Sequence, residues 1–218
     1  MTNYHYWQYF LSLETDLITT SRYIEFSGVN DDNVENSNDR AFSTELLRIF
    51  LTACAECENI LKILLAKENV SENINFTNIV NIQKSIMDIS TYDKLPNRII
   101  TCEAYNLSFT PWKDWNNPRT SPQWWKDHNS VKHGRANGTN SNYHLANVFN
   151  ALSSVAALMC LLFEYYKEPF GANEGRNVIK DRVSLPPALA PKLFTPKESG
   201  LGFGNIYWCW QPEGFRNT

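Results

Sequence analysis

An apolar stripe in the second quarter of the chain restricts the possible folds more than any other feature. Its members step by three and four over about six turns: Phe42, Leu46, Ile49, Phe50, Ala53, Cys57, Ile60, Leu61 and Leu64. This spacing is typical of one face of an α-helix, and Asp39 or Ser43 is the candidate N-cap. A helix this long must bury its single apolar face against other helices. The stripe therefore predicts an antiparallel helical bundle.

Other segments repeat the helical spacing. Residues 7–26 carry apolar side chains at helical intervals, and a shorter helix is expected around 79–89. Residues 143–167 are apolar nearly all round, which is typical of the central member of a bundle. Residues 98–109 fit either an extended strand or a short helix. The expected boundary residues are Gly28 after the first helix and Ser141 or Asn142 before the last.

The composition changes at Pro169. Six prolines fall between Pro169 and Pro212, and glycines recur among them, which predicts an extended segment without a core of its own. Its apolar run, residues 206–210, is expected to dock on the bundle or on a second copy of the chain. The predicted fold is all-α, with an up-and-down bundle of four to five helices over residues 1–167 and an extended Pro/Gly-rich C-terminal tail over 168–218.

The whole-chain composition excludes several classes of protein. A formal net charge of −3 and a pI near 5.8 give no global nucleic-acid footprint. The first ten residues lack a basic region followed by an apolar run, so no signal peptide is expected. Five cysteines without paired spacing favour reduced thiols and a cytoplasmic location. The unbroken apolar run Val155–Phe163 is too short to span a bilayer, so no membrane association is expected.

Charge is distributed unevenly along the chain. Residues 31–45 hold five acidic residues and one basic residue, Arg40. Between Trp112 and Arg135 the balance is reversed, with two acidic residues against five basic ones: Lys113, Arg119, Lys126, Lys132 and Arg135. This local excess predicts a basic patch on an otherwise acidic protein.

A short helix is predicted inside the basic segment. Ser121 can cap its start, Pro122 suits its first position and Gly134 suits the position after its end. Residues three and four apart share one face of a helix. The polar residues expected on one such face are Lys126, Asn129 and His133.

A cation, an amide and an imidazole on one face can bind a phosphate group or move a proton beside one. In metal-free phosphodiester chemistry, a histidine takes or gives a proton at a ribose oxygen while a cation stabilises the charged phosphorane. Such a site needs two acid–base groups, and this helix supplies one well-placed histidine. A symmetric dimer would supply the second. The alternative interpretation is a half-exposed helix with its tryptophans in the core.

The tryptophans and cysteines favour packing over chemistry. Four tryptophans lie within fourteen residues: Trp112, Trp115, Trp124 and Trp125. No strand alternates aromatic and basic residues, so burial is favoured over base stacking. Cys54 and Cys57 are spaced C-x2-C but lie inside the predicted long helix without a second pair, which favours buried thiols over a metal site. No metal or cofactor is predicted.

Two runs of residues indicate a family. Ala53–Lys62 reads ACAECENILK on the long second helix, and Trp125–Arg135 reads Trp-x-x-His-Asn-x-Val-Lys-His-x-Arg before the long apolar helix. Over roughly residues 7–167 the chain resembles the HEPN superfamily through these runs. Many members of that superfamily are RNases of toxin–antitoxin and antiphage systems, and others only bind nucleotides or RNA. The RNases combine an arginine, usually followed by a polar residue, with a histidine a few residues later, across a dimer.

The resemblance assigns roles to residues of this chain. It makes His133 the acid–base residue, and Asn129 belongs to the Asn-x-x-x-His pattern of one subgroup. Lys126, followed by Asp127, takes the position of the arginine. Lysine lacks the planar fork that grips a phosphate through two bonds, which bears more on catalysis than on binding. The residues expected to contact substrate are Lys132, Arg135, His128 and Trp125.

The expected function is that of an HEPN-like cytoplasmic protein that binds or acts on RNA or a nucleotide. In its enzymatic form it is a metal-independent endoribonuclease of a toxin–antitoxin or antiphage system. It is expected to act as a homodimer, and its expected protein partner is an antitoxin or another defence-system component. The alternative is a non-catalytic module that binds a nucleotide, RNA or a partner protein. A third hypothesis is a structural dimer assembled through its tail.

Overall fold

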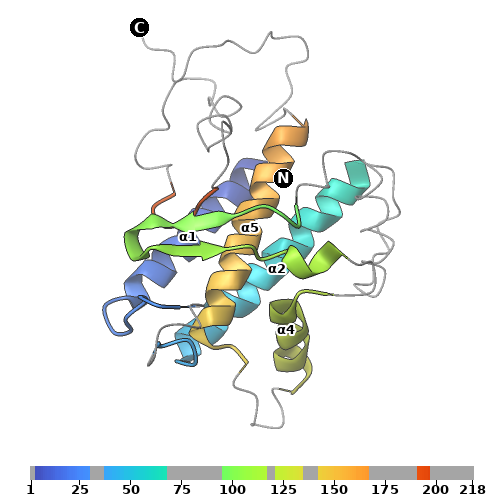
Figure 1. Cartoon of the computed structure of the whole chain (residues 1–218). Helices are drawn as coiled ribbons and strands as arrows, with labels where there is room; N and C mark the ends of the chain where they lie inside the picture. Colours follow the sequence, from blue (N-terminus) through green and yellow to red (C-terminus); the bar gives the residue numbers. More distant parts are fainter. Residues whose placement is uncertain are drawn as a thin grey trace, which may run out of the picture.

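Four α-helices dominate the part of the chain that the computed structural model describes, which is residues 3–29, 37–67, 95–116, 121–134, 142–166 and 191–196. These helices are α1 (Asn3–Thr20), α2 (Thr44–Lys67), α4 (Gln123–Gly134) and α5 (Leu145–Tyr166). Helix α5 contacts the other three, and its pairing with α2 is the most extensive (Figure 1). The helix predicted around 79–89 lies outside the described residues.

Helix α2 is the helix that the apolar stripe predicts. Every stripe residue from Leu46 to Leu64 is buried. The Ser43 hydroxyl accepts a hydrogen bond from the backbone N–H of Leu46 at 3.1 Å, so Ser43 is the N-cap. Phe42 is the exception, because it precedes the helix and its side chain is 60% exposed.

Helix α5 is the centre of the core. All its side chains from Leu145 to Leu162 are buried except that of Asn150, which is half-buried. The stretch Leu145–Leu162 is long and apolar enough to cross a membrane, with a mean hydropathy of 1.8, yet 94% of it is buried inside the protein. It is buried at the centre of the described structure, in contact with α1, α2 and α4.

The start of α5 differs from the prediction. The carbonyl of His144 accepts a hydrogen bond from the N–H of Val148 at 3.1 Å. His144 is therefore the capping residue instead of Asn142, while Ser141 lies outside the described residues. The backbone carbonyls of residues 41 and 39 accept hydrogen bonds from the N–H groups of Leu145 and Ala146, the first two helical residues. The segment before α2 therefore supplies acceptors for N–H groups that have no partner within α5.

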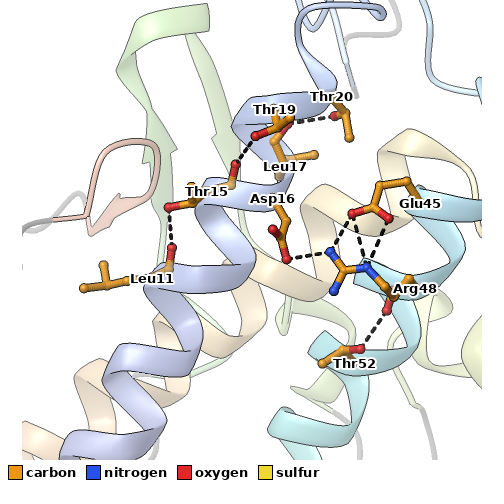
Figure 2. Close-up of polar contacts among 9 residues, drawn as sticks. All are labelled: Leu11, Thr15, Asp16, Leu17, Thr19, Thr20, Glu45, Arg48 and Thr52. Atoms are coloured by element: carbon orange, nitrogen blue, oxygen red, sulfur yellow. Dashed lines mark hydrogen bonds and ion pairs between the residues drawn. The ribbon is translucent and has the colours of Figure 1, made fainter.

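Helix α1 ends earlier than the predicted range 7–26. The hydroxyls of Thr20 and Ser21 each donate to the carbonyl three residues before them, at 2.7 Å (Figure 2 shows the Thr20 bond). These bonds satisfy carbonyls of the last turn without a further turn of helix. The following turn contains Gly28 with a φ of 76°, a left-handed conformation that glycine adopts without steric cost.

A small antiparallel sheet corrects the prediction of an all-α fold. Its strands are β1 (Ile100–Cys102), β2 (Leu107–Phe109) and β3 (Thr195–Pro196), in the order β2-β1-β3. Ile100 faces Phe109 and Cys102 faces Leu107, and these four side chains are buried. The described chain is thus mostly helical, with one small sheet packed on α5. Residues 98–109, for which a strand and a short helix were both possible, contain the β1–β2 hairpin of this sheet. A short 3₁₀ turn, η3 (Glu103–Tyr105), lies between the two strands.

Residues 191–196 are the described part of the predicted tail, and they lie on the bundle. The hydroxyl of Thr101 in β1 donates to the carbonyl of Thr195 at 3.0 Å. The buried carboxylate of Glu14 in α1 accepts three backbone N–H groups, from Lys192, Leu193 and Phe194, at 2.7, 2.7 and 3.0 Å. Burial raises the pKa of Glu14, and these three hydrogen bonds act in the opposite direction. The boundary predicted at 167/168 and the apolar run 206–210 lie outside the described residues.

Candidate functional site on helix α4

The short helix predicted in the basic segment is α4, Gln123–Gly134. Its first helical hydrogen bond runs from the N–H of Lys126 to the carbonyl of Pro122 at 3.2 Å. Pro122 therefore occupies the cap position that was assigned to Ser121. Gly134 is the last helical residue and not the residue after the end.

The inward face of α4 is aromatic. The residues of α4 that are buried are Trp124, Trp125, His128 and Val131. Trp124 stacks edge-on against Trp112, with ring centroids 5.4 Å apart, and its indole N–H donates to the carbonyl of Pro111 at 2.8 Å. Trp112 and Trp115 are buried as well. The four tryptophans form part of the core, which confirms the interpretation that they pack.

The outward face of α4 carries the predicted polar cluster. Lys126 and His133 are exposed and Asn129 is half-buried. At about 100° per residue these three positions lie within one third of the helix circumference. Lys132 is exposed too, and Arg135 lies outside the described residues. The structure therefore brings a cation, an amide and an imidazole to one solvent-facing side of the helix.

His128 and Trp125, two residues predicted to contact substrate, lie on the inward face instead. The side chain of His128 is 5% exposed, and its ring lies 4.9 Å from Trp125 and 6.2 Å from Phe50 of α2, measured between centroids. Burial lowers the pKa of His128 to about 4, with a smaller contribution from Lys132. His128 is therefore uncharged at neutral pH, and among the described residues its Nδ1 has no hydrogen-bond partner.

A polar network joins α4 to the start of α5. The Asp127 carboxylate accepts hydrogen bonds from the side-chain amides of Asn147 at 2.8 Å and Asn142 at 3.3 Å. The Asn147 amide also donates to the backbone carbonyl of Asn142 at 2.7 Å. This network holds α4 against α5 and orients its outer face.

Sequence reasoning did not identify this network. The signal for it was Asn147, a polar residue inside the most apolar stretch of the chain. A polar group buried in a helix core needs a hydrogen-bond partner, and here that partner is the residue after Lys126.

An imidazole–cation contact that the sequence did not predict lies beside this network. Nη1 of Arg40 lies 2.9 Å from Nε2 of His144, the capping residue of α5. His144 is 8% exposed, whereas Arg40 is exposed. Burial lowers the pKa of His144, and the nearby guanidinium of Arg40 lowers it further.

The cysteine pair of α2 is structural. Cys54 and Cys57 are fully buried, as predicted, and burial raises the pKa of both thiols. The Cys57 thiol donates to the carbonyl of Ala151 in α5 at 3.8 Å. Across the described ranges, no three His, Cys, Asp or Glu side chains gather as a metal site would require.

No protein-family model, curated protein or solved structure matches this chain. The resemblance to the HEPN superfamily stays a prediction based on the two runs of residues quoted above. The outer face of α4 and the chemistry of its side chains are therefore the best indication of function.

Proposed function

We propose that this protein is an HEPN-like, RNA- or nucleotide-associated protein that binds phosphate groups on the outer face of α4. The supporting observation is the position of three side chains: Lys126, Asn129 and His133 share one side of a helix whose opposite side is buried. Packing of the inner face holds the backbone of α4 in place. The outer side chains are therefore positioned in advance and lose less conformational entropy when a ligand binds.

The chemistry of this face suits a phosphodiester backbone. Lys126 and Lys132 supply positive charge, which attracts phosphate without regard to sequence. The Asn129 amide both donates and accepts hydrogen bonds. A histidine at position 133 can donate to a phosphate oxygen or exchange a proton with a ribose hydroxyl.

In the enzymatic form of this proposal the protein is a metal-independent endoribonuclease of a toxin–antitoxin or antiphage system in the cytoplasm. His133 acts as the acid–base residue, Lys126 stabilises charge on the phosphate and Asn129 orients the substrate or the imidazole. The second acid–base group comes from His133 of another copy in a homodimer. His128 does not supply it, because it is buried and faces away from solvent.

The second candidate is a non-catalytic HEPN-like module that binds RNA, a nucleotide or a partner protein. The observation that favours it is Lys126 itself, since an ammonium cannot form the paired hydrogen bonds of a guanidinium with phosphate. Binding needs only the positive charge, whereas catalysis needs the charge placed accurately against the reacting phosphate.

Incubation of the purified protein with structured RNA in EDTA separates the two candidates. Cleavage by the wild type that disappears in His133→Ala, with an unchanged circular dichroism spectrum, supports the endoribonuclease. Absence of cleavage together with salt-sensitive binding that is lost in Lys126→Ala/Lys132→Ala supports the binding module. Lys62→Ala is the matched control, because this exposed lysine lies on α2 and is paired with Glu58 at 2.6 Å. A wild-type protein that shows neither cleavage nor salt-sensitive binding would refute the proposal.

A further inference from the structure

The contact between Arg40 and His144 holds a guanidinium with an uncharged partner. Every guanidinium nitrogen is a donor, so Nε2 of His144 must accept the hydrogen bond at 2.9 Å and cannot carry a proton. The imidazole is held in turn by a hydrogen bond to the backbone carbonyl of Asp39. A neutral ring therefore fixes the orientation of Arg40 without cancelling its positive charge.

Arg48, the other arginine near the start of α2, has charged partners instead of a neutral one. The Arg48 guanidinium is bound by two carboxylates, that of Asp16 in α1 at 2.6 Å and that of Glu45 one turn away on α2 (Figure 2). Among the described residues, no carboxylate lies within 4.0 Å of the Arg40 guanidinium. Both arginines are exposed, but of the two only Arg48 is bound by carboxylate oxygens of described residues.

The position of Arg40 relates it to the α4 site. Its partner His144 caps α5 through its backbone carbonyl, and Asn147 in the first turn of α5 binds Asp127, the neighbour of Lys126. His144 and Asn147 are one turn apart at the amino end of α5, so the contacts of Arg40 and of Asp127 belong to the same helix end. Lys126 is the residue before Asp127 on α4.

We propose that Arg40, positioned by His144, is a phosphate-binding residue that extends the α4 surface. This role rests on the proposed function and adds to it the planar fork that Lys126 lacks. A guanidinium with one edge held by an imidazole can present its remaining N–H donors to two oxygens of one phosphate. The phosphate belongs to an RNA backbone or to a mononucleotide, and both present the same oxygens.

The test is binding of a fluorescein-labelled single-stranded RNA oligonucleotide, followed by anisotropy at several salt concentrations. Arg40→Ala is expected to weaken binding by about tenfold and to reduce the slope of log affinity against log salt by about 1. Arg40→Lys should keep the slope yet recover only part of the affinity, because it keeps the charge but loses the fork. Arg48→Ala is the matched control, with an expected change below about twofold because two carboxylates already occupy that guanidinium.

The role of His144 is tested by a double-mutant cycle. His144→Leu removes the acceptor, and Arg40→Ala should then cause little further loss. Additive losses would show that His144 does not position Arg40. Urea unfolding of each variant checks that the loss of affinity is not a loss of fold.

Competition with inorganic phosphate and with adenosine monophosphate identifies the source of the phosphate. Displacement of the RNA by the mononucleotide at concentrations where inorganic phosphate has no effect assigns the site to a nucleotide, and resistance to both assigns it to a polynucleotide. Wild-type affinity in Arg40→Ala, with binding lost in Lys126→Ala/Lys132→Ala, overturns the role of Arg40 and leaves the proposed function intact. A wild-type protein that binds none of the three probes overturns both.

Discussion

His128 and His133 belong to the same short helix, but only His133 is exposed to solvent. Their five-residue separation places them on different sides of α4, and the packing of α4 against α2 decides which side is buried. His128 contacts the aromatic rings of Phe50 and Trp125, where an imidazolium would lose its hydration. It belongs to the core, and its titration therefore affects stability.

The buried imidazole predicts a pH-dependent stability. The folded-state pKa of His128 is about 4, below the unfolded value of about 6.5. Its contribution to stability is therefore complete above pH 6.5 and is lost as the pH falls toward 4, by up to about 3 kcal/mol. His144, whose pKa is also lowered, acts in the same direction. In His128→Leu the loss of stability between pH 7 and 4, measured by urea unfolding, should shrink by this amount.

His133→Ala is the control for this measurement. It leaves His128 in place and should change the pH dependence much less than His128→Leu does, because His133 is the smallest of the causes that lower the pKa of His128. Equal pH dependence of the wild type and His128→Leu would contradict the assignment of His128 as a buried, uncharged residue.

Among the elements, strand β3 is attached to α1 through a single carboxylate. Glu14 of α1 binds three consecutive N–H groups, those of residues 192–194, directly before β3. Strand β3 has two residues, so its pairing with β1 contributes little on its own. The carboxylate supplies the acceptors for these N–H groups, of which those of Leu193 and Phe194 are buried.

Glu14→Gln should therefore destabilise the protein by about 1–3 kcal/mol and loosen the segment around β3. The amide keeps one acceptor oxygen but places an NH₂ donor against a backbone N–H. Hydrogen exchange of residues 192–195 should accelerate in this variant, with exchange in α2 changed much less. Glu103→Gln, at an exposed carboxylate in the turn between β1 and β2, should change stability by less than about 0.5 kcal/mol. Unchanged exchange around β3 would show that Glu14 does not hold this segment.

At the scale of the whole molecule, the enzymatic form of the proposed function requires two chains. One chain offers a single exposed histidine on α4, and acid–base catalysis at a phosphodiester uses two such groups. Light scattering on the purified protein should therefore give about twice the chain mass of 25.2 kDa. A monomer that still cleaves RNA would refute the shared-site mechanism, and a monomer that only binds RNA would favour the binding module.

Elements whose signals are local can be predicted from the sequence alone. The spacing of the stripe from Leu46 to Leu64 and the uniformly apolar α5 each identify a buried helix, because a helix repeats its faces every three to four residues. The same spacing places Lys126, Asn129 and His133 on one face of α4.

Features that depend on residues far apart in the chain are visible only in the folded protein. Thr101 and Thr195 are 94 positions apart, and no local pattern at either position indicates that they pair. The alternation in Ile100–Cys102 and Leu107–Phe109 fits a hairpin, but a three-residue strand is too short to exclude a helical turn. The contact between Arg40 and His144 likewise required the chain before α2 to close the start of α5. Such contacts follow from how the whole core packs, and a local pattern carries no information about which distant residue supplies the partner.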